Sequence, residues 1–405
     1  MRCLAALGMA VISVLSVSMA VRAQTNLAQA LPELTGRYPV GRRSFYWLDA
    51  VRSGRPVPVA VWYPAESRPG TAAEYLPNLK LLLANPTTAQ AMASTFGSSA
   101  PSAQTGMIRP YSHENAPVAR RGGPFPILLF SPGFGNSPFC YAIQLEDLAS
   151  HGYVVVAVAH VRDSIGVVSP DGMVIPLDQP PAITGNEQFF KARAELWAED
   201  LVFALNQMRT LSQERNSSFF RALDLNSIGA FGHSHGGRSA ATACMLEPQI
   251  KACLNEDGRL DEGELQRPYW PLGNRAFHGT FAMLDWFDSG LDQQDFAAMH
   301  TTPGDYAKAR LKPSGAALEA YQAVEGGSYH FTLLQPGMKH TAFSDLPWLT
   351  ASSDPTRAQY GRYRSAIRVT VREFFDHMLK KKAVPMMACD SVQGEVLLQC
   401  SSHQK

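Results

Sequence analysis

The chain has 405 residues, of which 45% are hydrophobic and 18% charged, and its formal net charge is +1. These values are typical of a globular protein with one large domain or two modest ones. They argue against a nucleic-acid partner, because the longest basic tract, Lys380-Lys381-Lys382, is short and closes a predicted helix.

Residues 1–23 have the features of a signal peptide. Arg2 gives a positive start, residues 4–21 are apolar and small, and Val21-Arg22-Ala23 forms a cleavage site. An uncleaved membrane anchor is the alternative, but the Gly and Ser content and the small-residue end favour cleavage. We therefore expect a periplasmic or secreted protein in an oxidising compartment, with no stable membrane insertion after cleavage.

Five of the six cysteines lie beyond residue 23, so at least one has no partner within the chain. Cys389 and Cys400 lie in a tail, residues 386–405, where a disulfide would hold a chain end that otherwise frays. Cys244 and Cys253 are expected to be buried free thiols. Zinc-like spacing of Cys and His is absent from the sequence, and we expect no metal and no cofactor.

The amino-terminal part of the chain predicts a hairpin and one helix. Residues 44–50 and 57–63 read as paired strands around the turn 53–56. Residues 66–124 are rich in Ala, Ser, Thr, Pro and Gly, and a single helix at 79–93 is expected within them.

From residue 125 onward, short apolar runs alternate with helical segments. The runs are 126–130, 153–159, 227–231, 251–255, 280–284 and 329–334, and the main helices are expected at 142–150, 189–212 and 357–382. This alternation is typical of a mostly parallel sheet with helices on both faces. We therefore predict one α/β domain, 24–385, in which the more polar residues 258–327 form a cap-like insertion.

The segment Gly232-His233-Ser234-His235-Gly236 joins a predicted strand to a predicted helix. In this position Gly-x-Ser-x-Gly is the nucleophile elbow of an α/β-hydrolase fold, where a strained turn exposes the serine hydroxyl. Ser234 is therefore the predicted nucleophile. The alternative is a Gly-rich turn in which Ser234 only caps the helix.

A serine nucleophile needs a base and an acid, and both follow it along the chain in this fold. His340 follows the last predicted core strand, at the sheet edge where such folds hold ligands, and is the predicted base. Two places compete for the acid: Asp257 after strand 251–255, and Asp285 or Asp288 after strand 280–284. Topology alone does not separate them.

Acyl transfer through a serine also needs two backbone N–H donors for the oxyanion. One is expected from His235, directly after the nucleophile. The other is expected from the loop 131–135, where Phe134 is the predicted donor. A plain Pro-Gly turn is the alternative for this loop.

At several places the sequence resembles platelet-activating-factor acetylhydrolase and its bacterial relatives, which include dienelactone-hydrolase-like and carboxylesterase chains. The segments that carry the resemblance are LFSPGFG at 129–135, LASHGYVV at 148–155, VRDS at 161–164, the elbow at 228–237 and HTAFSD at 340–345. With the strand at 57–64, the resemblance covers roughly 125–257 and 328–346.

The resemblance implies an α/β-hydrolase fold and a serine esterase. The acid of the family falls on Asp257, and its oxyanion donors fall on Phe134 and His235. Two features depart from the family: Pro132 stands where His often precedes the first glycine, and the interval from Asp257 to His340 is longer. Both departures concern the substrate more than the chemistry.

The sequence thus predicts a secreted serine hydrolase that cleaves carboxylic esters with short acyl chains through Ser234, His340 and Asp257. The expected partner is a small-molecule or lipid ester. A polyester or cutinase-like hydrolase and a serine peptidase of the same fold are the alternatives. A non-catalytic binding protein on this fold is a third possibility, from another class.

Overall fold

The computed structural model describes most of the chain between residues 31 and 400. The described residues are 31–67, 70–96, 108–178, 186–258, 277, 279–288, 290, 293–302, 304–306, 327–351, 353–388, 391–393 and 396–400. The predicted signal peptide, much of the predicted insertion and Cys389 lie outside these residues. The predicted disulfide between Cys389 and Cys400 therefore also lies outside the description.

Six parallel strands form the centre of the sheet, and they confirm the six apolar runs predicted from the sequence. They are β4 (Phe125–Ser131), β5 (Val154–Val158), β8 (Leu223–His233), β9 (Ile250–Glu256), β10 (Thr280–Trp286) and β11 (Ser328–Leu333). Their order in the sheet is β11-β10-β9-β8-β4-β5. The strand order reverses beside β4, which is where a doubly wound sheet holds its ligands.

Antiparallel strands extend both edges of this central sheet. On one side β2 (Arg55–Pro64) pairs antiparallel with β5, β1 (Val40–Asp49) pairs antiparallel with β2, and the short strand β3 (His113–Glu114) pairs parallel with β1. On the other side β13 (Val396–Cys400) pairs with β11, and β12 (Ser391–Gln393) pairs with β13. The tail therefore contributes the last strands at one edge of the sheet.

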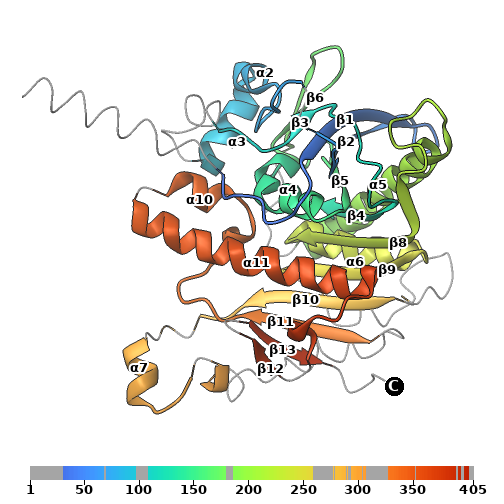
Figure 1. Cartoon of the computed structure of the whole chain (residues 1–405). Helices are drawn as coiled ribbons and strands as arrows, with labels where there is room; N and C mark the ends of the chain where they lie inside the picture. Colours follow the sequence, from blue (N-terminus) through green and yellow to red (C-terminus); the bar gives the residue numbers. More distant parts are fainter. Residues whose placement is uncertain are drawn as a thin grey trace, which may run out of the picture.

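Helices cover both faces of the sheet (Figure 1). α5 (Glu187–Gln213) and α6 (His235–Leu246) pack on one face, and α4 (Ala142–Ser150) and α11 (Asp354–Lys380) pack on the other. Successive side chains of β4 alternate between the two resulting cores, as the pleat of a strand requires. The predicted α/β-hydrolase architecture is confirmed in this arrangement.

The predicted helix at 79–93 consists of two helices, α2 (Leu79–Ala84) and α3 (Pro86–Phe96). Asn85 between them has an extended backbone, because the residue before a proline avoids the helical region. Its Oδ1 accepts a hydrogen bond of 3.1 Å from Thr88 N–H and so caps α3. Pro86 thus separates the two helices.

Several short elements have no counterpart in the sequence prediction. They are the hairpin strands β6 (Gly166–Val168) and β7 (Val174–Pro176), the helices α7 (Gln293–Ala298) and α10 (Leu346–Thr350), and the 3₁₀ turns Pro138–Tyr141, His340–Phe343 and Pro385–Met387. Elements this short do not display a hydrophobic period. Within the described ranges, none of the helices is both long and apolar enough to cross a lipid bilayer.

Cys244 and Cys253 form a disulfide, so the prediction that both are free thiols is wrong. Only residues 247–249 connect α6 to β9, and this short connection folds the helix back against the strand. The two Cα atoms are consequently 6.4 Å apart, within the range that a disulfide can bridge. The sequence pattern placed each cysteine on its element but did not indicate that the two face each other.

Candidate active site

Ser234 occupies a sharp turn between β8 and α6. Its backbone angles are φ 56° and ψ −126°, a conformation that is rare for any residue with a side chain. A Cβ atom added to Gly232 would overlap the backbone of Gly236, and one added to Gly236 would overlap the carbonyls of Ser131 and Pro132. The two glycines therefore allow β8, α6 and the end of β4 to meet around the serine.

The structure brings Ser234, His340 and Asp257 together in one chain of hydrogen bonds. His340 Nε2 lies 2.9 Å from Ser234 Oγ, and His340 Nδ1 lies 2.6 Å from Asp257 Oδ2. Asp257 follows β9, and His340 begins the turn after β11, so both reach the carboxyl edge of the sheet from different strands. The His340 side chain is 48% exposed and Ser234 is half-buried, so both ends of the Ser234–His340 hydrogen bond are in contact with solvent.

Asp257 is held in place from two sides. Trp286 Nε1–H at the end of β10 donates to Asp257 Oδ2 at 3.0 Å, and Asp257 N–H donates to Leu284 O at 2.8 Å. Asn255 closes the turn that contains Asp257. Its side-chain amide donates to the carbonyl of Gly258 and accepts from the N–H of the same residue. Asp257 therefore accepts from His340 and Trp286 through the same carboxylate oxygen.

The competing acid, Asp285, belongs to a different pair. Its Oδ2 lies 2.7 Å from His330 Nε2, and it does not reach His340. Asp285 is still within β10, where it stands opposite Thr332 of β11, so its side chain projects from a face of the sheet and not from the edge. Asp288 is exposed. Among the candidates, Asp257 alone hydrogen-bonds the predicted base within the described residues.

The loop between β4 and the 3₁₀ turn Pro138–Tyr141 lies against the nucleophile. A Cβ atom added to Gly133 would lie 3.4 Å from Ser234 Cβ. Gly133 N–H donates to Tyr141 Oη at 3.0 Å, and Gly135 N–H donates to the carbonyl of Asp163 at 2.9 Å. Phe134 N–H, between them, donates to no acceptor in the described part of the chain. This amide is therefore available to a substrate oxygen.

The side chain of His235 packs among aromatic rings. Its ring centre is 4.6 Å from that of Trp197, 5.7 Å from Phe190 and 6.0 Å from Phe134, all edge to face. The two residues predicted to donate to the oxyanion are therefore in side-chain contact with each other. Both also contact the same tryptophan of α5.

Two residues that sequence reasoning did not single out connect the loops around Ser234. Tyr141 Oη lies 2.9 Å from His233 Nδ1, and His233 Nε2 lies 3.1 Å from the carbonyl oxygen of His340. Burial, and then the neighbouring His340, lower the pKa of His233 well below its usual value. The neutral ring thus donates from Nε2 to His340 O and accepts from Tyr141, which in turn accepts from Gly133 N–H.

A second set of the same residue types lies behind this site. Ser131 Oγ is 2.9 Å from His160 Nε2, and His160 Nδ1 is 3.0 Å from Asp200 Oδ2. All three side chains are at most 1% exposed. This set was not predicted from the sequence, because Asp200 lies in the middle of α5, far along the chain from Ser131.

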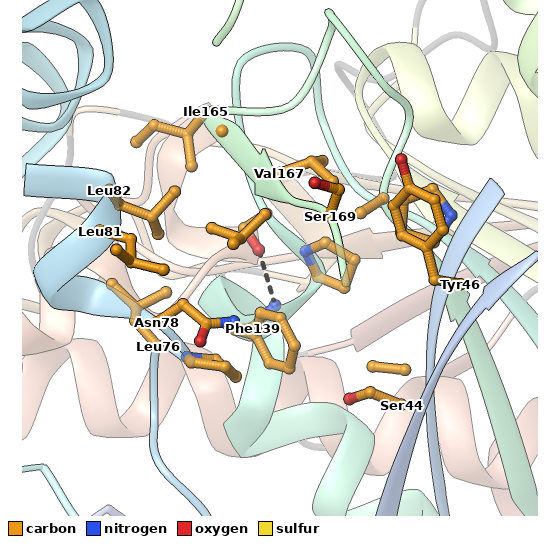
Figure 2. A pocket seen from close by; sticks show the side chains of 18 of the residues that line it. Ser44, Tyr46, Leu76, Asn78, Leu81, Leu82, Phe139, Ile165, Val167 and Ser169 are labelled. Carbon is orange, nitrogen blue, oxygen red and sulfur yellow. Dashed lines mark hydrogen bonds between the residues drawn. The ribbon is translucent and has the colours of Figure 1, made fainter. Parts of the chain in front are cut away.

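A separate cavity of about 580 Å³ lies between α2, β6 and the β1–β2 hairpin (Figure 2). Leu82 lies opposite Val167, with Phe139 beside them, and Ser44 and Ser169 add hydroxyl groups. None of its lining residues is charged, and none belongs to either serine set. Its chemistry favours uncharged, largely apolar groups.

Comparison with known proteins places the fold among the α/β-hydrolases. A ferulic acid esterase from Streptomyces cinnamoneus superposes with a TM-score of 0.64 over 92% of this chain and 99% of that chain, at 22% sequence identity. At this identity the likeness establishes the shared fold.

The amino-terminal part of the chain is similar to one particular family. The family model of platelet-activating factor acetylhydrolase, isoform II, matches residues 23–170. A probable 1-alkyl-2-acetylglycerophosphocholine esterase from Arthroderma benhamiae is 31% identical over 141 residues, which are 33% of this chain and 32% of that protein. The match therefore spans about a third of the relative's length. The resemblance seen in the motifs is confirmed, although Ser234, Asp257 and His340 lie beyond the matched range.

Proposed function

We propose that the chain is a carboxylic ester hydrolase that works through an acyl-enzyme on Ser234. The observation that carries the proposal is the hydrogen-bonded chain from Ser234 through His340 to Asp257, which begins at a strained and accessible turn. Ser234 is a weak nucleophile on its own, and a base within hydrogen-bond distance corrects this.

In the proposed reaction, His340 Nε2 takes the proton of Ser234 Oγ as the oxygen attacks the ester carbonyl. Asp257 keeps the proton of Nδ1 in place and stabilises the imidazolium that forms. The N–H groups of Phe134 and His235 bind the carbonyl oxygen as it becomes negative. His340 then protonates the leaving alcohol, and water releases the acid by the same steps.

Esters with short acyl groups are the proposed substrates. The relative from Arthroderma benhamiae is named for an acetyl ester, and the residues that match the acetylhydrolase family model, 23–170, include the loop that presents Phe134. A lipid ester or a small-molecule ester fits this proposal, whereas the alcohol part of the substrate is left open by it.

We further propose that the protein is exported to the periplasm or the medium. The signal-like residues 1–23 support this proposal, and so does the Cys244–Cys253 disulfide, because such bonds persist in oxidising compartments. Amino-terminal sequencing of the protein from fractionated cells tests it. A cytosolic protein that retains residue 1 would contradict it.

The test of the function is hydrolysis of p-nitrophenyl esters from acetate to palmitate. We expect the rate to peak at acetate or butyrate, and Ser234→Ala to lower kcat by about 10⁵-fold or more. Ser239→Ala is a matched control, because this buried hydroxyl one turn along α6 donates to a helix carbonyl.

Two further results would redirect the proposal. A folded wild-type protein that cleaves peptide anilides but no ester would favour the serine peptidase alternative, and one that cleaves polyester films faster than soluble esters would favour the cutinase-like alternative. Absence of all turnover, together with no labelling of Ser234 by a fluorophosphonate, would identify a binding protein.

A further inference from the structure

The buried set Ser131, His160 and Asp200 repeats the order of hydrogen bonds found at Ser234. Its carboxylate, however, is neutralised by two arginines. Arg55 donates to both oxygens of Asp200 at 2.8 Å, and Arg52 Nη1 lies 2.8 Å from Oδ1.

The protonation of the buried set follows from these contacts. Burial acts to raise the pKa of Asp200, but the hydrogen bonds from Arg55 and His160 outweigh it and lower the pKa to about 2. Burial lowers the pKa of His160, against the opposing effect of Asp200. A neutral His160 therefore donates from Nδ1 to Asp200 and accepts the Ser131 hydroxyl at Nε2.

The three side chains are at most 1% exposed, so they cannot contact a substrate. They adjoin the loop 131–135, which carries the proposed oxyanion donor Phe134. Ser131 is the last residue of β4, and Phe134 follows three residues later. Ser131 Oγ is anchored by His160, so the position at which the chain leaves the sheet is fixed. Fixing this exit point fixes the start of the loop that carries Phe134 N–H.

A stack of aromatic rings connects the buried set to Phe134 and His235, the two proposed oxyanion donors. The ring of His160 lies parallel to Trp197 with 4.1 Å between centres, and Trp197 lies parallel to Phe134 at 5.9 Å. Trp197 and His235 contact each other with their rings nearly perpendicular and 4.6 Å between the ring centres.

Asp163 ties this stack to the loop a second time. Its carboxylate accepts from Trp197 Nε1–H at 2.8 Å, while its carbonyl accepts from Gly135 N–H at 2.9 Å. The loop is thus held before Phe134 through Ser131 and after it through Gly135.

We propose that Ser131, His160, Asp200 and Trp197 form a positioning cluster that sets the place of the Phe134 amide at the oxyanion. The proposal rests on the proposed esterase function and adds residues to it that touch no substrate. Oxyanion donors act over short distances, and a misplacement of about 1 Å costs on the order of 10²-fold in rate. A rigid support behind the loop therefore contributes to catalysis through geometry alone.

The test compares Ser131→Ala with Ser131→Thr, which retains the hydroxyl. We expect Ser131→Ala to lower kcat on p-nitrophenyl acetate roughly 10- to 100-fold with little change in KM. Binding of a trifluoromethyl ketone, whose adduct with Ser234 carries an oxyanion, should weaken by a similar factor. Ser131→Thr should recover most of both. Ser150→Ala is the matched control, because this equally buried hydroxyl donates to Asp147 O, away from the loop.

A lower melting temperature with unchanged kcat and unchanged ketone affinity would overturn the proposal, since the cluster would then only stabilise the fold. If Ser131→Ala does not fold, Trp197→Phe replaces it, because this change keeps an aromatic ring in the stack while it removes the donor to Asp163 and reduces the stacked area. A parallel loss of kcat and ketone affinity in this variant supports the proposal, and its absence rejects it. Failure of the esterase function is distinct, because the wild-type protein would then be inactive on every ester.

Discussion

Two serine–histidine–aspartate sets in one molecule differ in backbone and in access. Ser131 ends a regular strand and is 0% exposed. Ser234 occupies a turn with φ 56° and hydrogen-bonds His340, whose side chain is 48% exposed. The serine–histidine distance is 2.9 Å in both sets, whereas the histidine–aspartate distance is 3.0 Å in the buried set and 2.6 Å at Asp257. The proposed active site therefore differs from the buried set not in its three residue types but in its strained turn and its open face.

The charges around the two carboxylates differ as well. Arg52 and Arg55 neutralise the Asp200 carboxylate, and the neighbouring His160 is neutral. Asp257 accepts hydrogen bonds from Trp286, which is an uncharged donor, and from His340, the proposed base. A base that must hold a proton during each turnover needs such a partner.

Among the substitutions that test this difference between the two sets, Asp257→Asn is expected to have the largest effect. The amide no longer stabilises the His340 imidazolium or fixes its tautomer, so kcat should fall by about 10⁴-fold while the protein remains folded. The measurement is ester hydrolysis under saturating substrate. Asp285→Asn is the matched control, because this carboxylate pairs with His330, and it should retain activity within a few-fold. Equal losses in the two variants would contradict the assignment of Asp257.

A smaller effect, on stability and not directly on chemistry, is expected from Asp200→Asn. Removing one partner of a buried ion pair costs about 3–5 kcal/mol, so the variant should unfold at a lower urea concentration at pH 7. The depressed pKa of Asp200 gives the wild type stability that is present above pH 4 and is lost as the pH falls through about 2. This contribution is roughly 2 kcal/mol, and unfolding curves at several pH values measure it. If the Asp200→Asn variant loses the same amount of stability as the pH falls, groups other than Asp200 are responsible for the pH dependence.

The smallest effect is expected from Trp286→Phe, which removes one hydrogen bond to Asp257 and keeps a ring in place. A hydrogen bond to a charged group contributes about 1.5 kcal/mol, so kcat should fall about tenfold. Trp348→Phe on α10 serves as a control for the loss of a buried indole. If kcat is unchanged in the Trp286 variant, the turn around Asn255 and Gly258 suffices to hold Asp257.

The sequence predicted those parts of the site that depend on local pattern. The six central strands were visible because fully buried strands are apolar throughout, and Ser234 was visible because its turn requires glycines on both sides. His340 followed from its place after the last central strand. The choice of Asp257 over Asp285 needed the family resemblance, because one residue more or less at a strand end decides whether a side chain leaves by the edge or by the face.

Contacts between segments that are far apart in the sequence could not be predicted from local sequence patterns. Tyr141 reaches His233, which lies 92 residues further along the chain, and Asp200 reaches His160 from the middle of a helix. Neither contact leaves a mark in spacing or composition. The Cys244–Cys253 disulfide was missed for the same reason, since which faces of α6 and β9 meet is decided by the packing of the helix on the sheet. Predictions for residues 1–23 and for the Cys389–Cys400 pair remain predictions.

The β1–β2 turn at the edge of the sheet has a consequence for how this sequence can vary. Arg52 lies within that turn and Arg55 begins β2. Both are far along the chain from every residue proposed to touch substrate, yet both bind Asp200. Changes in this hairpin and changes in the loop that carries Phe134 are therefore expected to be epistatic. A hairpin grafted from a homologue without these two arginines would need compensating changes in α5.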